Sequence, residues 1–127
     1  MRTTFTAHEG VRICVLDFSN ISGEPEALGA IAEAKEIIGK EPQASVYTLT
    51  DVTGSRVTSA IRNALHDLTQ ANKPYVVAGA VVGVTAIQGV ILRGIVQVTR
   101  RRLVAKNTRA EAMAWLATEA KLDSAKR

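Results

Sequence analysis

The segment VRICVLDFS, at residues 11–19, carries apolar side chains at most positions, and it restricts the fold more than any other part of the sequence. In an extended strand, successive side chains point to opposite faces. Ile13 and Val15 would therefore lie on one face, and Cys14, Leu16 and Phe18 on the other. A strand that is apolar on both faces belongs inside a sheet that other elements cover on both sides.

Strand and helix patterns alternate around this segment. Residues 2–7 are strand-like, and the short break that ends in Gly10 predicts a hairpin with the apolar strand. A helix is expected from about Pro25, which suits a first helical turn, to Gly39. Its apolar residues recur at the spacing of one helical stripe: Ala27, Ala30, Ile31, Ala34 and Ile38.

The rest of the chain continues this alternation, with strands predicted at 44–51 and 75–83 and a short strand at 103–106. A helix is predicted over 84–102, and a capping box at Thr108 and Glu111 begins the last helix. The helix between the strands at 44–51 and 75–83 presents one apolar face, which consists of Val57, Ala60, Ile61, Ala64, Leu65 and Leu68.

The predicted order of elements is ββαβαβαβα, which indicates an α/β fold with a mostly parallel sheet, an N-terminal antiparallel hairpin and right-handed crossovers. A chain of 127 residues is expected to form a single domain over 1–127, with a frayed tail at 119–127. Trp115 and Leu116 are interpreted as core packing of the last helix rather than as a binding motif.

Several classes of partner are disfavoured by composition. The net charge of +4 permits contact with phosphates, but aromatic residues make up only 4% of the chain, too few for a platform that stacks nucleic-acid bases. The uncharged stretch 75–92 passes the length criterion for a membrane span. It is rich in Val, Ala and Gly, however, and its first half is needed as a strand of the sheet. The absence of a signal peptide and the single cysteine favour the cytoplasm.

Residues with metal-binding or nucleophilic side chains do not form a recognisable catalytic site. His8 and His66 stand far apart, and Cys14 falls in a buried strand, so no metal, cofactor or catalytic residue is predicted. The glycines of the second half lack the Gly-Lys-Ser/Thr ending of a phosphate-binding loop. They are interpreted as packing glycines, at Gly79, Gly83, Gly89 and Gly94.

Polar residues follow the predicted strands at their carboxyl ends, where open α/β sheets bind ligands and where helix N-termini attract anions. Under a first interpretation these residues bind a ligand, and the candidates are Ser19, Asn20, Asp51, Thr53, Ser55 and Thr85. Under a second interpretation, Ser55, Thr85 and Thr108 are helix caps and Asp51 closes a turn onto its own backbone.

The order of elements and several local strings resemble the STAS domains, the anti-sigma factor antagonist or SpoIIAA-like family of bacterial proteins. The similarity covers nearly the whole chain and rests on the opening hairpin, the strings YTLTDVTG and YVVAGAVVGV, and the closing TRAEAMAWL. It implies a sheet and helices wound as a βα superhelix. It also implies a non-enzymatic module that binds a partner protein. The alternative is a protein that binds a small anionic or lipid-like ligand in the crevice at the strand ends.

Regulatory members of that family carry Asp-Ser-Ser-Gly at the start of the corresponding helix, and a partner kinase phosphorylates the first serine. If DVTG at 51–54 takes this role, Val52 stands at the acceptor position. If TSAI at 58–61 takes it, Ser59 replaces the acidic residue and Ala60 the acceptor. The motif is intact in neither placement, so we expect no phosphorylation switch.

The predicted helix within 84–102 carries apolar residues beyond a single face. One stripe consists of Ile87, Ile91, Ile95 and Val98. A helix that is apolar on a second face is either deeply buried or packs against a partner, and a symmetric homodimer is the commonest solution. The residues outside the stripe form the candidate dimer interface, Val90, Leu92 and Val96.

Overall fold

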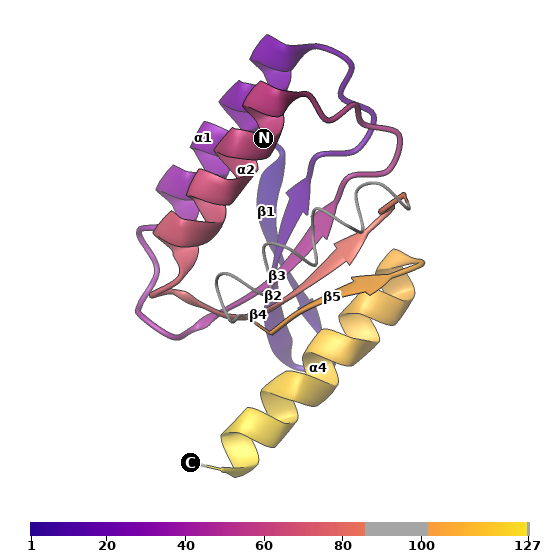
Figure 1. The fold of residues 1–127 in the computed structure, drawn as a ribbon. Coiled ribbons are helices and arrows are strands. Elements are labelled where there is room, and N and C mark those ends of the chain that lie inside the picture. Colours follow the sequence, from indigo (N-terminus) through magenta and orange to yellow (C-terminus); the bar gives the residue numbers. More distant parts are fainter. Residues whose placement is uncertain (86–101, 127) are drawn as a thin grey trace.

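The computed structural model describes residues 1–85 and 102–126, which form five strands and three helices (Figure 1). The strands are β1 (Thr3–His8), β2 (Val11–Asp17), β3 (Val46–Asp51), β4 (Val76–Val82) and β5 (Arg102–Lys106). The helices are α1 (Glu24–Ile38), α2 (Ser59–Asn72) and α4 (Arg109–Ala125).

The strands form one sheet in the order β1-β2-β3-β4-β5. β1 and β2 are antiparallel, whereas the pairs β2–β3, β3–β4 and β4–β5 are parallel. The hairpin turns through Glu9 and Gly10, whose φ angles of 50° and 78° are both positive, as the tight two-residue turns of hairpins require. The predicted α/β class, the parallel sheet and the N-terminal hairpin are therefore confirmed.

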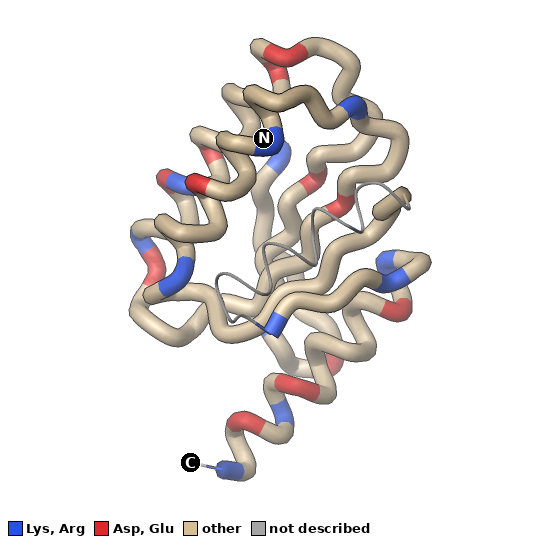
Figure 2. The backbone as a smooth tube through the Cα atoms, viewed as in Figure 1, with Lys and Arg blue, Asp and Glu red and all other residues tan. Residues whose placement is uncertain are grey.

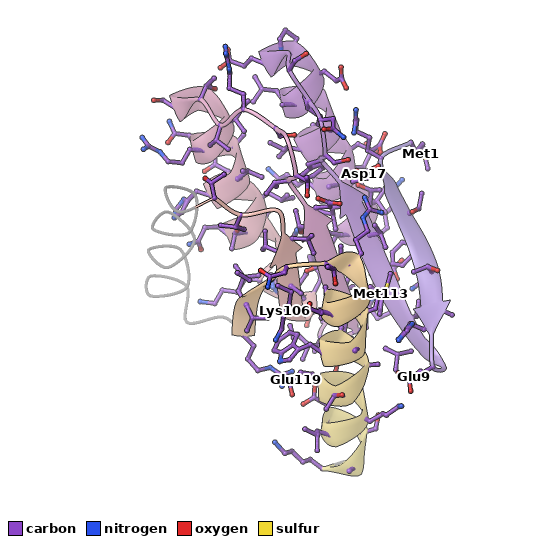
Figure 3. The ribbon with its side chains drawn as sticks, turned by 90° about the vertical axis from the view of Figure 1, so that its right-hand side faces the viewer. Met1, Glu9, Asp17, Lys106, Met113 and Glu119 are labelled. Atoms are coloured by element: carbon purple, nitrogen blue, oxygen red, sulfur yellow. The ribbon has the colours of Figure 1, made fainter. Side chains whose placement is uncertain are left out.

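Helices cover both faces of the sheet: α1 and α2 lie on one side and α4 on the other (Figures 1 and 3). β2 supplies side chains to both hydrophobic cores, as predicted. Cys14 and Leu16, together with Phe18 directly after the strand, pack with α1 and α2. Ile13 and Val15 pack with α4, which contacts all five strands. Apolar side chains on alternate positions of one strand thus join the two layers of helices.

The predicted stripe of α1 is confirmed in full, because its buried residues are the five that the sequence pattern indicates. The start of α2 differs from the prediction. Its N-cap is Thr58, whose hydroxyl accepts a hydrogen bond of 3.2 Å from the amide of Ile61. Ser55 and Val57 therefore belong to the loop that precedes α2 rather than to the helix.

α4 begins as the capping pattern predicts and ends later than expected. The hydroxyl of Thr108 accepts a hydrogen bond of 3.1 Å from the amide of Glu111. We expected residues 119–127 to fray, but α4 continues to Ala125. Asp123 fixes this end of the helix, because its carboxylate accepts hydrogen bonds from the Tyr47 hydroxyl at 2.6 Å and from the Arg102 guanidinium at 2.7 Å.

Two sequence predictions fall wholly or partly outside the described residues. The helix predicted over 84–102, with Val90, Leu92 and Val96 as its candidate dimer interface, lies almost entirely within 86–101. The uncharged stretch 75–92 contributes β4 to the sheet, between β3 and β5. No helix in the described ranges has the length and apolar character that crossing a membrane requires.

Candidate functional site

The carboxyl ends of β2 and β3 lie side by side, because Asp17 and Asp51 are paired in the parallel register. The loops that follow them are joined by backbone hydrogen bonds. The amide of Phe18 donates to the carbonyl of Asp51 at 2.9 Å, and the amide of Asn20 donates to the carbonyl of Thr53 at 2.7 Å. The fold therefore gathers the candidates of these two loops in one place.

Ser19 and Asp17 form a closed turn in the first loop. The amide and the hydroxyl of Ser19 both donate to the Asp17 carboxylate. From outside the loop, the guanidinium of Arg2 donates to the carbonyls of Asp17 and Ser19, at 2.9 and 3.2 Å. The Ser19 hydroxyl is thus used to hold the loop in place, which is a common role for serine in turns.

Ser55 joins the two loops rather than capping α2. Its hydroxyl donates to the carbonyl of Phe18 and accepts a hydrogen bond of 2.9 Å from the amide of Ile21. The interpretation of Ser55 as a helix cap is therefore wrong, because Thr58 takes that role. The Ser55 side chain therefore holds its own loop against a loop that is distant in the sequence.

Glycines permit a close approach of the loops at two points. Gly54 has a φ of 71°, and a Cβ atom there would lie 2.4 Å from the Asn20 side-chain oxygen. Gly83 follows β4 with a φ of 84°, and a Cβ atom there would lie within 2.6 Å of three Thr53 atoms. A side chain would be strained at either position and would force the loops apart. Gly83 is therefore a packing glycine, as predicted.

Asp51 connects this loop pair to α4. One of its carboxylate oxygens accepts a hydrogen bond of 2.9 Å from the amide of Thr53, so Asp51 does close a turn onto its own backbone. The other accepts one of 2.7 Å from Nε of Arg109, whose terminal nitrogen lies 3.1 Å from Asp17. One guanidinium at the start of α4 therefore joins the ends of β2 and β3.

Arg109 does not appear among the residues predicted from the sequence, although one signal was present. A cation in the first turn of a helix opposes the positive end of the helix dipole. Arg109 directly follows the cap Thr108, and this position indicates that carboxylates lie nearby to compensate for its positive charge. Here those carboxylates belong to Asp17 and Asp51.

The two carboxylates have pKa values below their ordinary range, for different reasons. Burial alone raises the pKa of Asp51, but hydrogen bonds from Thr53 and from Arg109 outweigh it. The pKa of Asp17 is lowered mainly by the hydrogen bond from the Ser19 hydroxyl, with a smaller contribution from the charge of Arg109. Both groups are therefore anionic at neutral pH, and two guanidinium groups, those of Arg109 and Arg2, lie beside them.

Thr85 is exposed beyond the end of β4, and Thr53 is exposed in the second loop. Within the described ranges, no group of three or more His, Cys, Asp or Glu residues could hold a metal ion. Cys14 is buried, and burial raises the pKa of its thiol to about 12. A thiol with that pKa is protonated at neutral pH and is a poor nucleophile.

A separate small hollow lies between α1, α2 and the loop at 52–58, and we call it the α1–α2 crevice. Its volume is about 20 Å³, close to the space of one water molecule, and its lining is almost entirely carbon. It is lined by Phe18, Ile21, Ala27, Ile31, Val52, Ser55, Arg56, Val57, Ile61 and Leu65.

Comparison with known proteins identifies the fold. No protein-family model and no curated protein matches the sequence. A solved structure of an anti-sigma-factor antagonist (STAS) domain protein from Planctomyces limnophilus is similar, with a TM-score of 0.61 and 16% identity. The alignment covers 91% of this chain and 97% of that one. The chain has the STAS fold. The resemblance noted in the sequence is therefore confirmed as a similarity of fold.

Proposed function

We propose that this STAS-fold chain is a non-enzymatic interaction module that acts by binding a partner protein. The proposal rests on one observation, namely that the polar groups at the strand ends bond to other parts of the chain. Ser19, Ser55 and Asp51 bond to the two loops and to Arg109, so these groups serve to fix the shape of a surface. A surface of fixed shape favours recognition of another protein, since little conformational entropy is lost on binding. The name of the similar structure, an anti-sigma-factor antagonist, supports the same class of function.

Two observations argue against the alternative of a small anionic or lipid-like ligand. The guanidinium of Arg109 is already paired with the carboxylates of Asp17 and Asp51, so its charge is not available to an anion. The α1–α2 crevice, at about 20 Å³, is far smaller than the roughly 300–1,000 Å³ of a typical ligand pocket. In addition, acidic and basic residues are interspersed along the described backbone rather than gathered on one side (Figure 2).

Two measurements test the proposal. Affinity capture from the native host with the tagged chain should retain a specific protein, whereas the same capture with heat-unfolded chain should not. A thermal-shift screen with nucleotides, inorganic phosphate and fatty acids should leave the melting temperature unchanged. A saturable rise in melting temperature with one of these compounds, without any captured protein, would show that the chain binds small ligands instead.

We also propose that this module is not switched by phosphorylation between Asp51 and Ala60. The acceptor position holds Val52 or Ala60, neither of which has a hydroxyl. Intact mass spectrometry of protein purified from the native host should therefore show a dominant unmodified species. A dominant form heavier by one phosphate, with the modification mapped to Ser55 or Ser59, would contradict this prediction.

A further inference from the structure

The α1–α2 crevice is a small opening in the hydrophobic core between the two helices, and a cation lies at its edge. Its walls are the apolar side chains of both helices and both loops, and the Ser55 hydroxyl within it is bonded to Phe18 and Ile21. Water inside such a hollow finds few hydrogen-bond partners, so replacing it with an apolar group is favourable. The small volume suits the tip of one aliphatic side chain and is too small for an acyl chain.

A cation lies at the same hollow. Arg56 lines the crevice and is exposed, and its guanidinium makes no ion pair in the described ranges 1–85 and 102–126. Its backbone amide donates to the carbonyl of Ile21 at 3.4 Å, which ties this part of the loop to the first loop. The carboxylate of Glu24 is bonded to the Thr58 hydroxyl at 2.6 Å. Arg56 is therefore an exposed positive charge beside an apolar hollow.

We infer that the α1–α2 crevice is a docking point for a protein segment in which an aliphatic side chain lies next to Asp or Glu. The aliphatic tip enters the hollow, and the neighbouring carboxylate pairs with Arg56. This inference rests on the proposed function and adds to it the place and the chemistry of recognition. Charge complementarity with Arg56 selects an acidic segment, and the volume of the hollow selects a side chain rather than a lipid.

Peptides selected from a random displayed library on the immobilised chain test the inference directly. The enriched sequences should share an aliphatic residue beside Asp or Glu. A synthetic copy should bind the Arg56→Glu variant at least about tenfold more weakly in calorimetry, because a charge-assisted contact becomes a repulsion. Ala27→Val, which fills the hollow from α1, should weaken binding in the same way. Circular dichroism and thermal melts verify that both variants fold.

Arg62→Glu is the matched control, because Arg62 is an exposed arginine early in α2 that does not line the crevice. It should change the affinity by no more than about twofold, the size expected from a distant surface charge. The absence of an enriched motif, or equal loss of affinity in Arg56→Glu and Arg62→Glu, would overturn the inference. A rise in melting temperature with dodecanoate that Arg56→Glu abolishes would also overturn it, in favour of a lipid.

Affinity capture separates this inference from the proposed function. A host protein retained by the unmodified chain and lost with Arg56→Glu agrees with both. A host protein retained equally by both forms preserves the interaction module but overturns the crevice as its docking point. Failure to capture any protein with the unmodified chain, together with a small ligand that stabilises it, would refute the proposed function itself.

Discussion

The carboxylate of Asp51 has partners in two parts of the chain, the Thr53 amide in its own loop and the Arg109 guanidinium at the start of α4. Its side chain is only 9% exposed, so water cannot replace a lost partner completely. Asp51→Asn keeps the size and one acceptor oxygen but removes the charge. We expect the variant to lose about 1–3 kcal/mol of unfolding free energy at neutral pH in denaturant melts. An equal cost for Asp67→Asn, an exposed aspartate on α2, would show that the effect is not specific to this site.

The same carboxylate predicts how stability changes with pH. The pKa of Asp51 is lower in the folded chain than the ordinary value of 3.8, because its hydrogen bonds outweigh burial. The stabilisation is present above that ordinary value, and it is lost as pH falls from it through the lower pKa of the folded state. Wild type should therefore lose unfolding free energy more steeply than Asp51→Asn in this acidic window. Parallel curves for the two proteins would contradict the assignment.

Two glycines offer a matched pair of substitutions with opposite expected effects. Gly83→Ala places a methyl group within 2.6 Å of three Thr53 atoms at a φ of 84°, and it should cost more than about 2 kcal/mol. Gly29→Ala lies within α1, where the new Cβ meets no atom within 4 Å beyond its neighbours and the helix's own backbone, and it should stabilise the chain by about 0.5–1 kcal/mol. Thermal melts distinguish the two. Similar shifts for both would mean that the loops do not interlock through Gly83.

Individual residues differ in how far their roles could be predicted from the sequence. Thr108 was predicted as a cap because both partners of the motif lie within four residues, and it is one. The same local reasoning predicts a cap at Ser55, yet its hydroxyl bonds to the carbonyl of Phe18, 37 positions away. Arg109 was missed for a related reason, because Asp51 is 58 positions away. The role of a side chain could be predicted where its partners are close in the sequence, whereas a role that depends on contacts between distant loops could not.

Among the elements, α4 carries the clearest test of packing, because Trp115 and Leu116 are adjacent and differ in burial. Leu116 is 0% exposed in the core beneath α4, whereas Trp115 is partly buried against that core. Leu116→Ala should cost about 2–5 kcal/mol through the cavity that it leaves. Trp115→Ala should cost less, about 1–3 kcal/mol, because part of the ring is already in water.

Thr118→Ala is the control for this pair, since Thr118 is exposed on the same helix and its removal should change stability by no more than about 0.5 kcal/mol. Denaturant melts that rank Trp115→Ala above Leu116→Ala would show that the ring, not the leucine, anchors α4. The sequence indicated that both residues pack in the core, but it could not grade their burial. That difference depends on how α4 lies across the sheet.

The elements themselves were largely predictable, because each pattern reflects a covered surface. The stripe of α1 matches its buried residues, and β2 is apolar on two faces because helices cover both. The errors lie at boundaries. α2 starts at Ser59 because the preceding loop extends along the first one, and α4 extends to Ala125 because Asp123 binds Tyr47 and Arg102. Neither tertiary contact leaves a periodic signal in the sequence.

For the whole molecule, the sequence predicts a homodimer through Val90, Leu92 and Val96, which lie outside the described residues. Leu92→Glu and Val96→Glu should each yield a folded monomer, because a charge in an apolar interface is costly to desolvate. Sedimentation at micromolar concentrations measures the change. Asn63→Glu, which adds the same charge at an exposed position of α2, should leave the dimer intact. A monomeric wild type would instead mean that these side chains pack within the chain.

The order of strands in the sheet is also their order in the chain, and this has a consequence for synthesis on the ribosome. Each new strand emerges next to an edge that has already formed, so the sheet can grow by single additions without rearrangement. α4 emerges last, although it contacts all five strands. Until then, none of the helices in the described ranges 1–85 and 102–126 covers Ile13, Leu49 and Ala80. The apolar face that α4 covers is therefore completed only when α4 has left the exit tunnel, and a chaperone that shields that face would act before then.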